Sequence, residues 1–128
     1  MTILVRALAA LWGFGFSAMA LQGIFDPAAF TEAFGVTAEG HSINNLRADY
    51  GGFFLVSGLG ALWGALRPSD AKALWVPAAL FGAAFLIRIV GLADGDPGDP
   101  SITQAMIVEA VSVLFLLGSA RYLGRSEA

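Results

Sequence analysis

The chain alternates between long apolar stretches and short polar segments. Four apolar stretches, at about residues 3–24, 46–66, 73–92 and 102–123, match the length of a membrane-spanning helix, which is about 20 residues. The polar segments between them are rich in glycine, proline and aspartate, which favour turns. The pattern therefore predicts an all-α protein with a single domain, residues 1–128, folded as a four-helix transmembrane bundle.

The first apolar stretch permits a second interpretation. Arg6 precedes an apolar run that reaches Ala18-Met19-Ala20, which is the pattern of a signal peptide and its cleavage site. The apolar run continues past this site to Phe25, and three more stretches follow. We therefore expect a helix that is retained.

Composition agrees with a membrane protein. The chain is 57% hydrophobic and 13% charged, whereas an average soluble domain is about 45–50% apolar and about 25% charged. A small soluble protein has a large surface for its volume and must cover it with polar groups. The excess of apolar side chains makes the lipid bilayer the first expected partner.

Basic and acidic residues alternate from one polar segment to the next. Basic residues lie at the N-terminus (Arg6), in the segment 67–72 and near the C-terminus (Arg121 and Arg125). The loops after the first and third stretches are acidic. Because cytoplasmic loops are enriched in lysine and arginine, we expect both termini in the cytoplasm and a multi-pass protein of the bacterial inner (cytoplasmic) membrane.

The loop after the first stretch has a local helix signal. Asp26 suits an N-cap, Pro27 suits the first helical position, and Gly35 can end a short helix. Alanines and phenylalanines between them form an apolar side. We predict a short interfacial helix in this first outer loop, with a lid over the mouth of the bundle as the alternative.

Small residues recur at four-residue spacing in three of the stretches. In lipid, such residues let helix backbones approach closely, so these stripes are candidate contact faces. The stripes are Ala9/Gly13/Ser17, Ser57/Ala61/Ala65, Gly60/Gly64, Ala78/Gly82 and Ala79/Ala83.

Two charges fall inside apolar stretches. Arg88 lies about 6 Å and Glu109 about 10–12 Å from the outer ends of their helices, at 1.5 Å per residue. Such charges are costly and usually face the protein interior. We expect an Arg88–Glu109 pair between neighbouring helices, with Ser112 donating a hydrogen bond to the carboxylate.

Further polar residues lie at the outer end of the second stretch. Arg47 and Tyr50 are three residues apart and are expected to share a face, while Asp49 points elsewhere, toward Arg88. A structural explanation is that the ion pair fixes helix register and the arginines reach the headgroups. The alternative is an outer ligand-binding pocket. Its candidate residues are Arg47, Asp49, Tyr50, Arg88 and Glu109.

The chain lacks the residues that several classes of functional site require. The chain has no cysteine and one histidine, His41, which excludes disulfides and thiolate metal sites and a two-histidine site within one chain. No catalytic motif occurs, and no basic stripe suggests nucleic acid. We therefore expect no metal and no cofactor. No motif indicates an enzyme, and the sequence leaves an enzymatic activity open.

The run Asn-Leu-Arg-Ala-Asp-Tyr-Gly-Gly at residues 45–52 resembles the signature of a bacterial family of small four-span membrane proteins. That family is known only as a domain of unknown function and is distantly similar to DoxX-like proteins. Its L-R-A-x-Y-G-G motif opens the second span, and an arginine in the third span and a glutamate in the fourth correspond to Arg88 and Glu109. The resemblance covers nearly the whole chain and implies the four-span fold without an activity.

Three functions remain open. We favour a binding or accessory protein that holds a small molecule or lipid headgroup in its outer half, alone, as a homo-oligomer or within a larger membrane complex. A transporter or channel subunit is the second, and it requires a polar path into the inner half. A quinone-linked redox protein, implied by the DoxX-like relatives, is the third and requires an apolar slot beside Tyr50 or Arg88.

Overall fold

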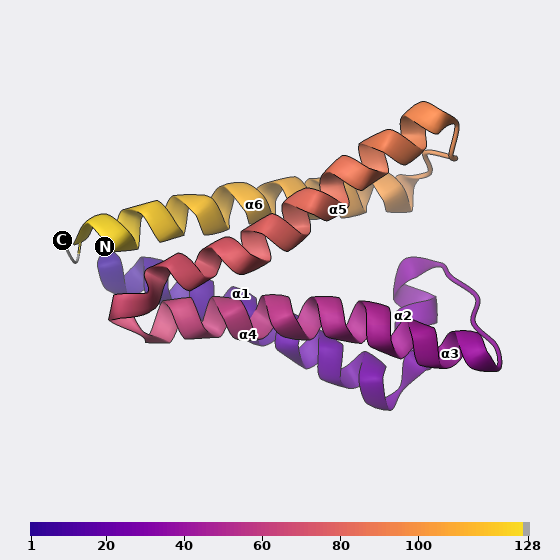
Figure 1. The fold of residues 1–128 in the computed structure, drawn as a ribbon, viewed down its shortest axis with the longest axis horizontal. Helices are drawn as coiled ribbons and strands as arrows, with labels where there is room; N and C mark the ends of the chain where they lie inside the picture. Colours follow the sequence, from indigo (N-terminus) through magenta and orange to yellow (C-terminus); the bar gives the residue numbers. More distant parts are fainter. Residues whose placement is uncertain (127–128) are drawn as a thin grey trace.

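The computed structural model describes residues 1–126, which are helical nearly throughout and contain no β-strand. The long helices run along one axis of an elongated molecule (Figure 1). The chain begins at the same end at which the last turns of α6 lie (Figure 1). We call this the terminal end, which also holds residues 67–74, and the opposite end, with residues 26–50 and 94–100, the loop end.

The helices confirm the all-α class and cover the four predicted stretches. Three segments, Thr2–Phe25, Ser69–Asp94 and Pro100–Ser126, are long and apolar enough to cross a membrane. The elements are α1 (Thr2–Phe25), α2 (Pro27–Phe34), α3 (His41–Leu46), the π-helical turn η1 (Arg47–Gly51), α4 (Gly52–Leu66), the 3₁₀ segment η2 (Pro68–Leu74), α5 (Trp75–Asp94) and α6 (Pro100–Ser126).

The second stretch is one helical rod rather than a single α-helix. Leu46, Gly51 and Gly52 all have right-handed helical backbone angles, so α3, η1 and α4 follow one another without a break. The rod therefore extends from His41 to Leu66, with a π-helical turn inside it.

Helices α1 and α4 pack backbone to backbone. A Cβ atom on Gly13 would lie 2.7 Å from the carbonyl oxygen of Gly58, and one on Gly58 would lie 2.6 Å from the amide nitrogen of Ser17. No side chain larger than hydrogen fits between these backbones. The predicted stripes Ala9/Gly13/Ser17 and Ser57/Ala61/Ala65 are buried, and both are confirmed as contact faces.

The other face of α4 receives η2 and the start of α5. A Cβ on Gly64 would meet Leu74 at 2.9 Å, and one on Gly60 would meet Pro77 at 3.3 Å, so this stripe is also a contact face. On α5, Ala78 is buried. Ala79 and Ala83 are exposed, so the prediction of a contact face there is wrong.

Two kinds of core hold the helices together. At the terminal end the core is aliphatic, and Ala9, Leu74, Leu116 and Leu123 are fully buried in it. A cluster of aromatic side chains lies next to this core, toward the loop end, and the centroids of its neighbouring rings are 4.3 to 6.4 Å apart. The aromatic cluster consists of Trp12, Phe16, Phe53, Phe54 and Phe81.

The predicted short helix is present as α2. The Asp26 carboxylate accepts a hydrogen bond from the Ala28 amide at 3.2 Å, and Gly35 ends the helix with a φ of 62°. Phe30 is 1% exposed and lies against Gly23, where a Cβ would collide with its ring. The apolar side of α2 therefore packs onto the protein, as the lid alternative expects, and its place in the membrane interface stays a prediction.

Helix α6 begins at a second Asp-Pro pair. The Asp99 carboxylate accepts hydrogen bonds from the Ser101 hydroxyl at 2.6 Å and from the amides of Ser101 and Ile102 at 2.8 and 3.0 Å. The bond from the Ser101 side chain, followed by that from the Ile102 amide, lowers the pKa of Asp99. This N-cap places the start of α6 at Pro100, two residues before the predicted boundary.

Candidate functional site

The pair predicted between the third and fourth stretches is present. Arg88 on α5 donates a hydrogen bond from Nε to Oε1 of Glu109 on α6, at 2.8 Å. The side chain of Glu109 is 8% exposed and that of Arg88 is 32% exposed. Helices α5 and α6 are neighbours here, since a Cβ on Gly82 would lie 3.7 Å from Val113, which is ordinary van der Waals contact.

The pair leaves hydrogen-bonding capacity unused. Oε2 of Glu109 is buried and has no hydrogen-bond partner among the described residues. Arg88 uses only Nε, and its two terminal nitrogens find no acceptor in residues 1–126. Buried polar groups are nearly always paired, so an unpaired carboxylate oxygen requires a physical explanation.

Ser112 does not complete the pair, and the prediction that it donates to Glu109 is wrong. Its hydroxyl instead accepts a hydrogen bond from the indole nitrogen of Trp12, at 3.1 Å. Trp12 lies on α1, so this bond ties the first helix to the last. The indole is a donor that can only be satisfied by an acceptor such as this hydroxyl when it is buried in an apolar interior.

The candidate residues Arg47, Asp49 and Tyr50 are not gathered around Arg88 and Glu109. Arg47 and Asp49 are exposed, and neither forms a hydrogen bond or ion pair within the described part of the chain. The predicted approach of Asp49 to Arg88 is therefore absent. Tyr50 is half-buried and packs on the rings of Phe30 and Phe34, at 5.9 and 4.9 Å.

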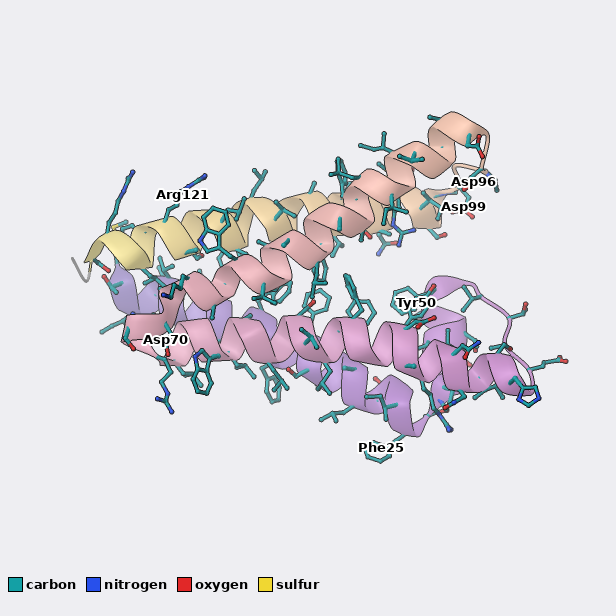
Figure 2. The ribbon with its side chains drawn as sticks, in the orientation of Figure 1. Phe25, Tyr50, Asp70, Asp96, Asp99 and Arg121 are labelled. Carbon is teal, nitrogen blue, oxygen red and sulfur yellow. The ribbon has the colours of Figure 1, made fainter. Side chains whose placement is uncertain are left out.

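The π-helical turn explains this arrangement. A π turn closes a wider ring than an α turn, so residues three apart no longer lie above one another. Arg47 consequently points to solvent while Tyr50 turns toward α2, and the prediction that they share a face is wrong. In Figure 2, Tyr50 lies on the side of the rod that carries α2.

Among the hollows on the surface of the described residues, two are well defined, and neither of these is lined by the five candidate residues. One, of about 500 Å³, lies between α1 and α2 and is lined partly by Gln22, Asp26 and Glu32. The other, of about 350 Å³, is an apolar crevice between α1 and α6. We call it the α1–α6 crevice; its lining is Trp12, Phe16, Ile107, Val108, Val111, Ser112 and Phe115.

The sequence contained a signal for the α1–α6 crevice. Ile107, Val111 and Phe115 recur at four-residue spacing and so form an apolar stripe on one face of α6. That stripe flanks the face of Glu109. What the pattern could not show is that α1 lies beside it. Ligand binding by any of the five candidate residues stays a prediction.

Acidic residues and His41 do not gather into a metal site in the structure. No group of three or more histidine, aspartate or glutamate side chains within residues 1–126 has the geometry to hold a metal ion.

A comparison with curated proteins and one with solved structures found no match. The match to the L-R-A-x-Y-G-G motif, the similarity to DoxX-like proteins and the bacterial origin therefore stay predictions. A comparison with protein families found one whose description is Domain of unknown function (DUF4345), and it matches residues 4–119. This range contains all five candidate residues and nearly all of the helical fold, and on that basis the chain belongs to the family of the domain of unknown function DUF4345.

Proposed function

We propose that the protein crosses the membrane four times and binds a small molecule or lipid headgroup at the Arg88–Glu109 pair, in the bacterial inner membrane. Three helical segments already have the length and apolar character of spans. The rod from His41 to Leu66 is the fourth, and it is longer than α1. Arg47 and Asp49 on its outer turn are exposed, as expected of residues at headgroup level.

The observation that carries the binding proposal is the unpaired Oε2 of Glu109. A buried charge is costly unless its hydrogen-bonding groups are satisfied. Beside this acceptor lie the unused terminal nitrogens of Arg88, which are donors. A ligand group that both donates and accepts, such as a hydroxyl, an amide or a protonated phosphate, would satisfy both partners at once.

The terminal end argues against a transport path. Its core consists of closely packed alanines and leucines, with Leu74, Leu116 and Leu123 fully buried. The aromatic cluster lies between this core and the loop end. A transporter or channel subunit needs polar groups or water through this half, so binding fits the observed packing better.

The quinone-linked alternative also lacks support from the packing. It requires an apolar slot beside Tyr50 or Arg88. Tyr50 is covered by the rings of Phe30 and Phe34, and the α1–α6 crevice is not lined by either residue.

Native mass spectrometry of the protein in gentle detergent tests the proposal. We expect the wild type to carry a bound small molecule or lipid, and Glu109→Gln to retain it about tenfold less, because a hydrogen bond to a charged group contributes roughly 1.5–3 kcal/mol. Asp94→Asn is the matched control, since Asp94 is an exposed carboxylate on the same helical hairpin.

Two outcomes would reject the proposal. If wild type and Glu109→Gln both carry no ligand and the variant unfolds more easily, the pair is purely structural. Equal loss of ligand in Glu109→Gln and Asp94→Asn would show a general charge effect instead of a site.

A further inference from the structure

Charge is distributed very unevenly between the two ends of the molecule. The terminal end carries exposed basic side chains, and Asp70 is its one acidic residue within the described part of the chain. The loop end is acidic. Apart from Arg88, its basic side chains among the described residues are Arg47 and His41. Figure 2 shows Arg121 and Asp70 at the terminal end and Asp96 and Asp99 at the loop end. The exposed basic residues of the terminal end are Arg67, Lys72, Arg121 and Arg125.

Two of these arginines lie over tryptophan rings. The guanidinium carbon of Arg67 lies 4.5 Å from the ring centroid of Trp63, and that of Arg121 lies 5.6 Å from the ring of Trp75. Both distances fall within the range of about 6 Å for a cation–π interaction. We call Arg67–Trp63 and Arg121–Trp75 the two Arg–Trp pairs. Trp63, Arg67 and Trp75 lie on either side of η2 in the chain, and Arg121 lies on α6.

The tryptophans are placed for an interface between water and lipid. Trp63 is 51% exposed and Trp75 is 46% exposed, and tryptophan is enriched at the headgroup level of membranes. The indole nitrogen of Trp63 donates to a carboxylate oxygen of Asp70 at 3.0 Å. This bond holds the ring over which Arg67 lies and uses one oxygen of Asp70.

The guanidinium N–H donors of both arginines remain free of a carboxylate. No carboxylate in residues 1–126 forms an ion pair with Arg67 or Arg121. A guanidinium presents several N–H donors in one plane, and these match the oxygens of a phosphate. Each arginine is therefore held at a tryptophan ring but not neutralised.

We propose that the two Arg–Trp pairs form a binding surface for the phosphate groups of anionic phospholipids in the leaflet at the terminal end. The inference rests on the proposed membrane-spanning fold and concerns the opposite end from the Arg88–Glu109 site. Charge complementarity selects the occupant, because the surface is basic and an anionic leaflet attracts such segments. Zwitterionic lipids offer the same phosphate with a compensating cation and bind less.

The test is a lipid titration of the full chain, followed by native mass spectrometry, with phosphatidylglycerol and phosphatidylcholine as probes. We expect the wild type to bind phosphatidylglycerol in preference to phosphatidylcholine. Arg67→Gln with Arg121→Gln should lower phosphatidylglycerol binding by more than the factor of about five per residue that loss of charge alone gives, because hydrogen bonds to the phosphate are lost as well. The double variant Lys72→Gln with Arg125→Gln is the matched control, because it removes the same charge from the same end without touching either tryptophan pair.

A charge-preserving variant separates binding from folding. Arg67→Lys with Arg121→Lys keeps the charge but removes the planar fork, so we expect most of the phosphatidylglycerol binding to be lost while thermal unfolding stays unchanged. Equal losses in the two glutamine double variants, or full binding by the lysine variant, would overturn the proposal. Glu109→Gln should bind phosphatidylglycerol as the wild type does, so failure of one proposal does not imply failure of the other.

Discussion

Arg88 and Glu109 are the charged residues that interact within the apolar part of the helical hairpin α5–α6. Removing such charges from water costs more than their attraction returns unless every group is satisfied. Their bond uses one nitrogen of Arg88 and one oxygen of Glu109, and the remaining oxygen is unpaired in the described chain. The pair therefore joins α5 to α6 but leaves one buried carboxylate oxygen without a hydrogen bond.

Breaking the pair on one side should be more harmful than removing it. Arg88→Leu leaves Glu109 buried without a counter-ion, and we expect it to lower the free energy of unfolding by about 3 kcal/mol, near the lower limit for buried pairs because Arg88 is one-third exposed. Arg88→Leu with Glu109→Leu should recover most of this loss. Thermal unfolding in detergent measures both. A double variant that is less stable than the single one would show that the pair stabilises the fold outright.

At the level of single residues, the sequence predicted the pair but not its surroundings. A charge inside an apolar stretch is visible in any sequence, so Arg88 and Glu109 could be identified. The partner of Ser112 could not be identified, since Trp12 is separated from it by a hundred positions. Only the packing of the first helix against the last brings these two side chains together.

Among the elements, α1 and α4 depend most on the absence of side chains. A Cβ on Gly58 would lie 2.6 Å from the backbone of Ser17, which cannot yield as a flexible side chain can. We expect Gly58→Ala to lower the free energy of unfolding by about 1–3 kcal/mol, the usual cost of overpacking. Gly15→Ala is the control, because a Cβ there meets nothing within 4 Å, and it should change stability by less than about 1 kcal/mol. Equal effects of the two variants, measured by thermal unfolding, would contradict close α1–α4 packing.

Helix starts were predictable where the local chemistry is strong. Asp26-Pro27 identified α2, because an aspartate N-cap followed by proline satisfies the free amides at a helix start. Asp99-Pro100 is the same signal and would have located α6, whose start was predicted from apolar content alone at residue 102. At these two helix starts, the capping residues therefore locate the boundary more accurately than the apolar content does.

The π-helical turn was not predictable from residue types. Arg47–Gly51 contains good helix formers and two consecutive glycines follow Tyr50, which does not distinguish an α turn from a π turn. The packing around Gly51 shows the tertiary constraint, since a Cβ there would lie 2.6 Å from Ile24 on α1. The wider turn sets Tyr50 against α2 and turns Arg47 and Asp49 to the outside.

For the whole molecule, the proposed topology can be tested because the chain has no cysteine. Single cysteines introduced at exposed positions will each be the only site for a membrane-impermeant maleimide. We expect Glu39→Cys and Asp96→Cys to react from the outside of spheroplasts, and Ser69→Cys to react only after permeabilisation. These positions lie at the loop end and the terminal end respectively.

The labelling pattern also decides the number of spans. If the rod from His41 to Leu66 did not cross the membrane, Glu39 and Ser69 would lie on the same side and Asp96 on the other. Reaction of Glu39→Cys and Ser69→Cys without Asp96→Cys from outside, or of Asp96→Cys alone, would therefore contradict four spans. Reaction of Ser69→Cys alone would instead show four spans with the opposite orientation.

The sequence by itself determined the all-α class, the positions of the long helices, the helix at Pro27–Phe34 and the pair of charges. These follow from local properties, namely apolar length, capping residues and the cost of a charge in an apolar stretch. Only the tertiary structure decided that Ser112 bonds Trp12, that α1 and α6 enclose a crevice, and that Arg47 and Tyr50 point apart. Each of these depends on which helices become neighbours and how each is rotated, and that is set by packing among residues far apart in the chain.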